Sequence, residues 1–295
     1  MAGLAIDAMR ILVVGGSGQL GTEIRRNWTH DDVVAPPHGQ LDIEDATAVD
    51  AAIALVKPDA LVNCAAFHNV DRCESEPERA YAVNAIAVDR AAALCELRGV
   101  AFVTFSTDYV FDGTATRPYV ENDCPRPLSV YGVSKLAGEL LTQRRGAKAL
   151  IVRTCGVYGV RPSASKGHTF VDRVIAQARA TQPMRVVTDV VASPTFAGHL
   201  ATAVRRLLEA GASGLYHVAD RGPVSWYDFA AEALRQAGIG GNLEPISAAV
   251  WKTTAPRPAF SALESGKLRS IGVEMPDWRE GIAAYLGLRA ASGEA

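Results

Sequence analysis

Along the first half of the chain, short runs of β-branched and leucine residues alternate with longer segments in which apolar residues recur every three or four positions. The short runs predict buried strands, and the longer segments predict amphipathic helices. The runs occupy residues 10–14, 32–35, 58–63, 100–105 and 149–152. Strands that alternate with helices are typical of a parallel sheet covered on both faces. The sequence therefore predicts an α/β fold with a doubly wound parallel sheet.

Beyond residue 160 this alternation loosens. The spacing of apolar residues predicts helices over 170–180 and 199–209, a further helix that begins near Ser225, and short strands at 185–187 and 215–218. We expect two units: residues 1–160, and a smaller lobe over residues 161–295. The smaller lobe is expected to close over the edge of the sheet and to return some of its elements to the first unit.

A glycine-rich loop, Gly15-Gly16-Ser17-Gly18-Gln19-Leu20-Gly21, joins the first strand to the first helix. Glycine permits a tight turn and lets the backbone approach a ligand, while the amide groups at a helix N-terminus attract phosphate. A strand before and a helix after the loop are the setting in which it binds a dinucleotide. The first unit is therefore predicted to be a Rossmann domain in which Gly15, Gly18 and Gly21 approach the cofactor.

The second strand ends in Pro36-Pro37-His38-Gly39 rather than in the acidic residue that usually binds the adenosine ribose. This difference weakens any preference for NAD over NADP. Arg25 and Arg26 are candidates for binding a 2′-phosphate, although arginines on an amphipathic helix are more often solvated. Asp42 is expected to be the N-cap of the following helix.

Two groups of polar residues carry candidate chemistry. Ser106-Thr107-Asp108 follows the strand at 100–105, at the carboxyl edge where parallel sheets bind ligands. Tyr131 and Lys135 are four residues apart on a predicted helix and therefore share one face. The lysine charge favours phenolate and is expected to lower the pKa of the tyrosine, which makes the two residues a proton-transfer pair. Such a pair is also common on helix surfaces, so its meaning depends on the strands and glycines before it.

Composition narrows the class of protein. Of the 295 residues, 48% are hydrophobic and 21% charged, and the net charge of −2 gives no electrostatic reason to expect nucleic acid or a membrane as a partner. No apolar run reaches the length of about 18 residues that predicts a membrane span. The segment before Met9 does not resemble a signal peptide, and Met9 is a candidate natural start. The five cysteines are scattered, which predicts reduced thiols in a cytoplasmic protein: Cys64, Cys73, Cys95, Cys124 and Cys155.

Taken in order, the glycine loop, Ser106-Thr107-Asp108-Tyr109-Val110-Phe111 and Tyr131-x-x-x-Lys135 resemble the extended short-chain dehydrogenase/reductase superfamily. Within it, the chain is most similar to the dTDP-4-dehydrorhamnose reductase family. The likeness runs from Met9 onward and includes these further motifs: Val62-Asn63-Cys64-Ala65-Ala66, Arg153-Thr154, Ser193-Pro194-Thr195, Ser225-Trp226-Tyr227-x-Phe229 and Arg257-Pro258-x-x-Ser261.

This resemblance implies hydride transfer from NADPH or NADH to C4 of a nucleotide-linked 4-keto-6-deoxy sugar. Tyr131 would be the general acid, Lys135 would hold the nicotinamide ribose and Thr107 would orient the carbonyl oxygen. The implied cofactor contacts are Gly18, Gln19 and Leu20 at the pyrophosphate, Asp42 and Ile43 at the adenine, and Cys64, Ala65 and Ala66 in the middle, with Thr107 and Asp108 touching the sugar. Such proteins are often dimers, so a homodimer is the expected assembly.

The chain departs from the family pattern at three positions of the expected substrate wall, which are Phe67, Gly156 and Phe260. Gly156 stands where the family often has tryptophan, so a flat surface for the sugar is lost. His68 could face the substrate or be a polar loop residue, and Asn84 could bond backbone in the core or support the site, the former being slightly favoured. Trp226 is expected to be a packing anchor between the lobes.

Relatives of this kind can carry Mg²⁺, and Asp189 and Glu264 are the candidate ligands, but no spacing in the chain demands a metal. Both are better interpreted as surface acids. Two other functions remain open: a different nucleotide-sugar reductase or epimerase, and a non-catalytic NADP-binding regulatory subunit similar to the beta subunit of methionine adenosyltransferase. A binding-only protein would have no chemical need for Thr107, Tyr131 and Lys135 together.

Overall fold

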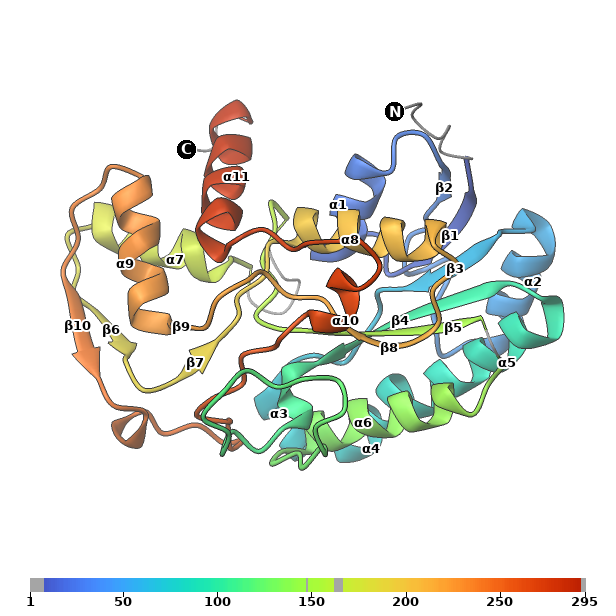
Figure 1. Cartoon of the computed structure of the whole chain (residues 1–295), viewed down its shortest axis with the longest axis horizontal. Helices are drawn as coiled ribbons and strands as arrows, with labels where there is room; N and C mark the ends of the chain where they lie inside the picture. The colour runs from blue at the N-terminus through green and yellow to red at the C-terminus, as the bar shows by residue number, and fades with distance from the viewer. Residues whose placement is uncertain (1–7, 147, 162–166, 293–295) are drawn as a thin grey trace.

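The computed structural model describes residues 8–146, 148–161 and 167–292, so most of the segment before Met9 lies outside the described residues. Six parallel strands within these ranges form one sheet, in the order β2-β1-β3-β4-β5-β8 (Figure 1). The strands are β1 (Arg10–Val14), β2 (Asp32–Val34), β3 (Ala60–Asn63), β4 (Ala101–Thr107), β5 (Ala149–Thr154) and β8 (Gly214–His217). The predicted doubly wound parallel sheet is confirmed, with β8 supplied by the later half of the chain.

Strand order places the site. β1 pairs with β2 on one side and with β3 on the other, so the chain reverses its direction of winding between β1 and β3. Ligands of open α/β sheets bind outside the carboxyl ends of the strands at such a reversal. The glycine loop follows β1, and Cys64-Ala65-Ala66 follows β3, so both segments flank this position.

Helices cover both faces of the sheet (Figure 1). α1 (Gln19–Asn27) and α8 (Ala197–Glu209) pack on one face. The opposite face carries α2 (Ala46–Val56), α5 (Val88–Arg98) and α6 (Val130–Gln143). Both faces are closed because the strands are apolar on both sides, as a parallel sheet requires.

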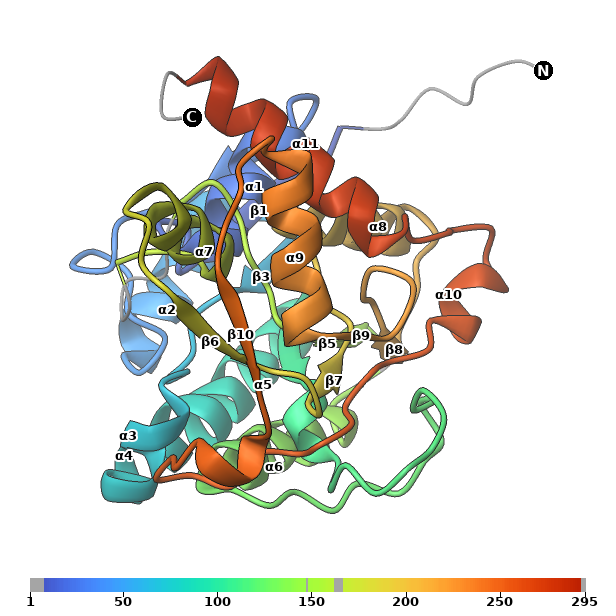
Figure 2. The same ribbon diagram turned by 90° about the vertical axis from the view of Figure 1, so that its left-hand side faces the viewer.

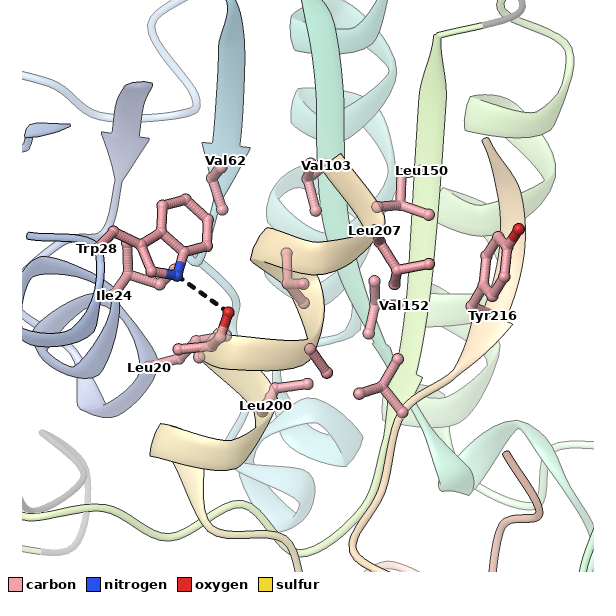
Figure 3. Close-up of a cluster of buried hydrophobic side chains, with 14 of the residues drawn as sticks. Leu20, Ile24, Trp28, Val62, Val103, Leu150, Val152, Leu200, Leu207 and Tyr216 are labelled. Atoms are coloured by element: carbon pink, nitrogen blue, oxygen red, sulfur yellow. Dashed lines mark hydrogen bonds between the residues drawn. The ribbon is translucent and has the colours of Figure 1, made fainter. Parts of the chain in front are cut away.

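The core between α1, α8 and the sheet is drawn in Figure 3. Leu20, Ile24 and Trp28 of α1 meet Leu200 of α8 over the buried strand residues. The indole nitrogen of Trp28 donates a hydrogen bond of 3.0 Å to the backbone oxygen of Ala201, which satisfies its polar atom inside the core. This contact joins the end of the helix that follows the glycine loop to a helix 173 residues later in the chain.

The later half of the chain adds further elements, most of which lie to one side of the sheet, as Figure 2 shows from that side. They comprise α7 (Phe170–Arg179), α9 (Trp226–Gln236), α10 (Gly266–Arg269), α11 (Trp278–Ala291), the parallel pair β6 (Met184–Val187) and β10 (Leu243–Ile246), and the antiparallel pair β7 (Val191–Ala192) and β9 (Val224–Ser225). Phe229, Ile282 and Tyr285 are fully buried where α9 and α11 pack. The expected elements of this half are confirmed, and α10, α11 and β10 were not predicted.

Three local predictions differ from the structure. Asp45 rather than Asp42 caps α2, because its carboxylate accepts hydrogen bonds from the amides of Thr47 and Ala48. The helix expected at 77–97 is a succession of α4 (Pro77–Tyr81), a π-helical stretch η1 (Ala82–Ala87) and α5, and it is preceded by the unpredicted α3 (Val70–Ser75). β4 continues to Thr107, so this residue ends the strand rather than following it. None of the helices in the described ranges combines the length and apolar character needed to cross a membrane.

Candidate active site

A cavity of about 410 Å³ lies where the carboxyl ends of the central strands meet the smaller lobe. Each of the segments that follow β1, β3, β4 and β5 contributes to its wall, as do α6, α9 and the segment before α10. Its lining includes Gly18, Gln19, Leu20, Cys64, Ala66, His68, Thr107, Asp108, Tyr109, Tyr131, Lys135, Cys155, Gly156, Trp226, Pro258 and Ser261. The topology therefore brings most of the predicted site residues to one place.

The glycine loop has the shape of a phosphate cradle. Gly15 has a left-handed backbone with φ of +76°, and a Cβ there would lie 2.8 Å from the amide nitrogen of Ala65. A Cβ on Gly21 would lie 2.5 Å from the Cα of Gly16, so neither position accepts a side chain. Gly18 is the N-cap of α1 and has no capping side chain in the described structure. The first amides of α1 therefore face the cavity wall without a side-chain competitor, which suits a dinucleotide pyrophosphate.

Tyr131 and Lys135 occupy one face of α6, which begins after Ser129. The Ser129 hydroxyl accepts a hydrogen bond of 3.2 Å from the amide of Gly132 and thereby caps the helix one turn before Lys135. Lys135 is 5% exposed, and burial lowers its pKa to about 8, although the charge of Glu139 opposes this shift. The lysine is thus buried, one helical turn from the phenol of Tyr131.

The electrostatics of Tyr131 differ from the sequence expectation. Burial raises the pKa of Tyr131 above its ordinary value, and a hydrogen bond with Thr107 only partly opposes that effect. When it is ionised, the Asp108 carboxylate raises the pKa of Tyr131 further. Burial has the largest effect on this pKa, because a buried phenolate loses the water that would stabilise its charge. In the protein without a bound cofactor, the Tyr131 phenol therefore keeps its proton. A general acid needs to be in this protonated state.

Besides its hydrogen bond with Tyr131, the Thr107 hydroxyl has two partners in the residues that follow it. It donates a hydrogen bond of 3.1 Å to Oδ1 of Asp108 and accepts one of 3.2 Å from the amide of Tyr109. Thr107 is 6% exposed and Asp108 is 3% exposed, although both line the cavity. The side chains of Ser261 and Cys155 also hydrogen-bond the Asp108 carboxyl group.

Asn84 fixes the position of α6 relative to the loop after β3. Its amide oxygen accepts a hydrogen bond of 2.9 Å from the amide of Phe67, and its amide nitrogen donates to Phe67 O and to Ser134 Oγ, both at 3.0 Å. A Cβ on Gly138 would lie 2.2 Å from the backbone oxygen of Asn84, so α6 also approaches η1 closely. Asn84 therefore bonds backbone, as favoured, and at the same time joins two segments of the cavity wall.

Comparison with known proteins identifies the family. Residues 9–289 match the family model described as the RmlD substrate binding domain. The chain belongs to this family. It is 35% identical over 285 residues to the spore coat polysaccharide biosynthesis protein SpsK of Bacillus subtilis, covering 96% of this chain and 99% of that protein. It is 36% identical over 293 residues to the dTDP-4-dehydrorhamnose reductase of Burkholderia thailandensis, covering 93% and 97%.

A solved structure of the same kind supports the fold. The crystal structure of dTDP-4-dehydrorhamnose reductase from Bacillus anthracis in complex with NADP superposes with a TM-score of 0.89 at 32% identity, covering 95% of this chain and 99% of that one. The recognition made from sequence motifs is confirmed by these matches. The wall of the cavity can accordingly be compared with the family pattern given above.

Of the three wall positions at which the chain departs from the RmlD family pattern, only Gly156 lines the cavity. It has φ of +51°, and a Cβ there would lie 3.2 Å from both the Cα of Pro194 and Cη2 of Trp226. The ring of Phe67 instead lies 5.2 Å from the Arg72 guanidinium, and Phe260 pairs with Val191 at a different surface groove. The expectation that Phe67 and Phe260 form the sugar wall is therefore not supported, since both turn to other partners.

Among the other predicted site residues, some line the cavity and others lie outside it. His68 lines the cavity, with its Nδ1 3.3 Å from the backbone oxygen of Ala66. Ala65 packs against Gly15, and its amide donates to the Asn63 side chain at 3.1 Å. Asp42 and Ile43 lie outside the cavity lining, and Ile43 is 2% exposed in the core. Their assignment to the adenine stays a prediction.

Sequence reasoning missed Cys155 and Ser261 as site residues. Cys155 follows β5, so the rule that placed Thr107 at the carboxyl edge could have placed this thiol there too. Ser261 was recognised only as part of the motif Arg257-Pro258-x-x-Ser261. It reaches the cavity from near the end of the chain, where its amide donates to Val191 O at 2.8 Å. Trp226 lines the cavity and packs edge-on against Phe170 and Phe229, which joins its predicted packing role to the site.

The two candidate metal ligands have other partners. Asp189 accepts hydrogen bonds from Ser247 Oγ and the amide of Ala248, and Glu264 pairs with Arg269. Within the described ranges, no group of three or more His, Cys, Asp or Glu side chains is arranged to hold a metal ion. The residues present do not fit a Mg²⁺ site, and their interpretation as surface acids agrees with their salt bridge and capping bonds.

Proposed function

We propose that this chain is an NAD(P)H-dependent oxidoreductase that reduces the C4 keto group of a nucleotide-linked 4-keto-6-deoxy sugar, converting dTDP-4-dehydrorhamnose to dTDP-L-rhamnose. The main observation in support is that Tyr131, Lys135 and Thr107 line the same cavity, beside the glycine loop. The relatives named dTDP-4-dehydrorhamnose reductase and the NADP complex of the Bacillus anthracis protein support the same reaction. No step is assigned to Mg²⁺.

When bound, the nicotinamide supplies the hydride. Tyr131 gives its phenolic proton to the carbonyl oxygen of the sugar while C4 accepts the hydride, so that the product is a neutral alcohol. The buried Lys135 holds the nicotinamide ribose and, in its charged form, stabilises the phenolate that remains. Thr107 orients the carbonyl oxygen. Asp108, which is hydrogen-bonded to Thr107, lies in the part of the cavity wall that contacts the sugar. The family resemblance implies these roles, and the presence of all four side chains in the cavity wall supports them.

The same proposal divides the chain by task. Residues 1–160 hold the cofactor through Gly15, Gly18, Gln19, Leu20, Gly21, Cys64, Ala65 and Ala66, and the lobe over residues 161–295 holds most of the sugar. Arg25 and Arg26 remain candidates for the 2′-phosphate of NADPH. We also propose that the enzyme is a cytoplasmic homodimer without nucleic-acid or membrane partners. Light scattering coupled to size-exclusion chromatography tests the dimer, since a monomeric mass contradicts it.

The deciding experiment follows the loss of nicotinamide absorbance with dTDP-4-keto-6-deoxy-L-mannose generated in place, with NADPH and NADH supplied separately. Oxidation of either cofactor, with dTDP-L-rhamnose identified by mass and by chromatography against a standard, supports the proposal. Turnover of a different keto sugar instead indicates another nucleotide-sugar reductase or epimerase. Cofactor binding without turnover on any keto sugar, together with co-purification of a partner enzyme, indicates the regulatory subunit.

A further inference from the structure

Three segments that are far apart in the sequence meet around the carboxyl group of Asp108. Thr107, at the end of β4, donates to its Oδ1 at 3.1 Å. Cys155, after β5, and Ser261, near the end of the chain, hydrogen-bond the same carboxyl group. Asp108 is 3% exposed, and all three side chains that bond it are uncharged. Burial among uncharged partners favours the protonated, uncharged form of a carboxyl group.

The number of hydrogens on Thr107 sets a constraint. A threonine hydroxyl carries one hydrogen and two lone pairs. One lone pair of Thr107 accepts from the amide of Tyr109, and its hydrogen points to Asp108. With Asp108 ionised, the second lone pair of Thr107 accepts from the hydroxyl of Tyr131, and Thr107 has no hydrogen left to donate to a carbonyl oxygen of the substrate.

We propose that Asp108 works as a neutral carboxylic acid, whose own hydroxyl donates to Thr107 and frees the Thr107 hydrogen for the substrate's carbonyl oxygen. Asp108 is then a positioning residue that acts through Thr107, and Cys155 and Ser261 fix the orientation of its carboxyl group. The step involves only the direction of hydrogen bonds, so no atom or electron is exchanged beyond those of the reduction. This inference rests on the proposed reductase function.

Burial favours the neutral acid. It raises the pKa of Asp108, and the hydrogen bonds from Ser261, Cys155 and Thr107 offset that effect only in part. A buried carboxylic acid kept neutral so that it can donate a hydrogen bond has precedent in other enzymes. Burial also raises the pKa of the Cys155 thiol, which therefore keeps its hydrogen and remains a donor.

The titratable groups that face Asp108 come from each segment packed on it. Tyr109 follows it directly, Tyr131 faces it from α6, and Cys155 faces it from the end of β5. The pKa of each is raised further when Asp108 is ionised. Lys135 lines the same cavity one turn beyond Tyr131, and Arg257 acts on Tyr109 from the later segment. Each of these groups could contribute to a loss of activity at high pH, so variants are needed to identify which group titrates.

The test compares the pH dependence of kcat in the native enzyme, Asp108→Asn and Cys155→Ala, from about pH 5 to about pH 10. In the native enzyme kcat falls at high pH as Asp108 ionises, and this fall is the alkaline limb of the pH profile. Asp108→Asn cannot ionise but still offers a donor, so its kcat should no longer fall at high pH, whatever kcat it retains at low pH. Cys155→Ala removes a donor that favours the carboxylate, so the limb moves to higher pH by about half a unit or more.

Cys95→Ala is the matched control, because Cys95 is also buried but lies on the core-facing side of α5, away from the cavity. It should leave the limb in place. A limb that is unchanged in Asp108→Asn, or a limb that moves down or stays in Cys155→Ala, would overturn the proposal. If Asp108→Asn does not fold, Cys155→Ala decides on its own.

A second measurement needs no turnover. Infrared difference spectra between the native protein and Asp108→Asn at neutral pH should show the carbonyl stretch of a protonated carboxyl group. Absence of that band overturns the neutral acid even if the enzyme is active. An enzyme that turns over no keto sugar refutes the proposed reductase function instead, while the infrared band still reports the state of Asp108.

Discussion

Glu139 and Arg153 form a two-pronged ion pair that is buried behind the wall of the cavity. Nη2 of Arg153 lies 2.6 Å from Oε2 of Glu139, and Nε lies 2.9 Å from Oε1, with the two side chains 3% and 1% exposed. The hydroxyl of Ser106 also hydrogen-bonds Glu139, and the Arg153 guanidinium lies 5.1 Å from the centre of the Phe111 ring. The pair thus joins β4, β5 and α6 one turn beyond Lys135.

Removing one partner of this pair should be costly. We expect Arg153→Met to lower the free energy of unfolding by about 3–5 kcal/mol, because it leaves the Glu139 carboxylate buried without a countercharge. The double variant Glu139→Gln/Arg153→Met should be less destabilised than Arg153→Met alone. Urea denaturation followed by circular dichroism measures both.

The exposed pair of Arg10 and Asp32, at 52% and 60% exposure, gives the control for that experiment. Arg10→Met should cost less than about 1 kcal/mol. Equal costs for Arg10→Met and Arg153→Met would show that burial of the Glu139–Arg153 pair has no special effect on stability.

Tyr131→Phe removes the proposed proton donor and little else. We expect kcat to fall by about a hundredfold to ten-thousandfold, while the dissociation constant of NADPH changes by less than about threefold. Absorbance assays and fluorescence titration give the two values. Tyr216→Phe, at a buried tyrosine of β8, is the control and should retain kcat. Turnover by Tyr131→Phe at the native rate would assign the proton to another group.

Cofactor binding should depend on pH through Lys135. Its pKa in the folded protein is lowered to about 8 by burial, so its positive charge is present below that pH and lost above it. The affinity of the free protein for the anionic cofactor should therefore fall as pH rises through about 8. Fluorescence titration of NADPH between about pH 7 and about pH 9 follows this change. Lys135→Met should bind more weakly at neutral pH and show no such dependence, and a flat native curve would contradict the role.

Gly156→Ala tests the sugar wall. The substitution adds a Cβ at a left-handed position and 3.2 Å from Trp226, so we expect a loss of about 1–2 kcal/mol in unfolding free energy and a raised KM for the sugar. Gly211→Ala is the matched control, because Gly211 has φ of +60° with no atom within 4 Å of its added Cβ. It should show the backbone cost alone and an unchanged KM. Equal KM values for both variants would remove Gly156 from the wall.

The sequence by itself determined the sheet, the glycine loop and the placement of Tyr131 and Lys135. These features depend on local spacing: alternation of apolar runs predicts strands and helices, and four residues set two side chains on one helix face. The carboxyl-edge rule then placed Thr107 and Asp108 correctly, because every parallel strand ends at the same edge. Helix starts were less secure, since Asp42 and Asp45 are equally good caps and only the backbone geometry chose Asp45.

Tertiary structure alone decided the environment of these groups. Burial of Lys135, which lowers its pKa, and of Tyr131, whose pKa rises, depends on segments that pack from elsewhere in the chain. The approach of Ser261 to Asp108 spans 153 positions of sequence, so no local pattern could announce it. Exclusion of water is a collective property of all the segments that surround a side chain, and for this reason the charge states in the cavity were settled only by the fold.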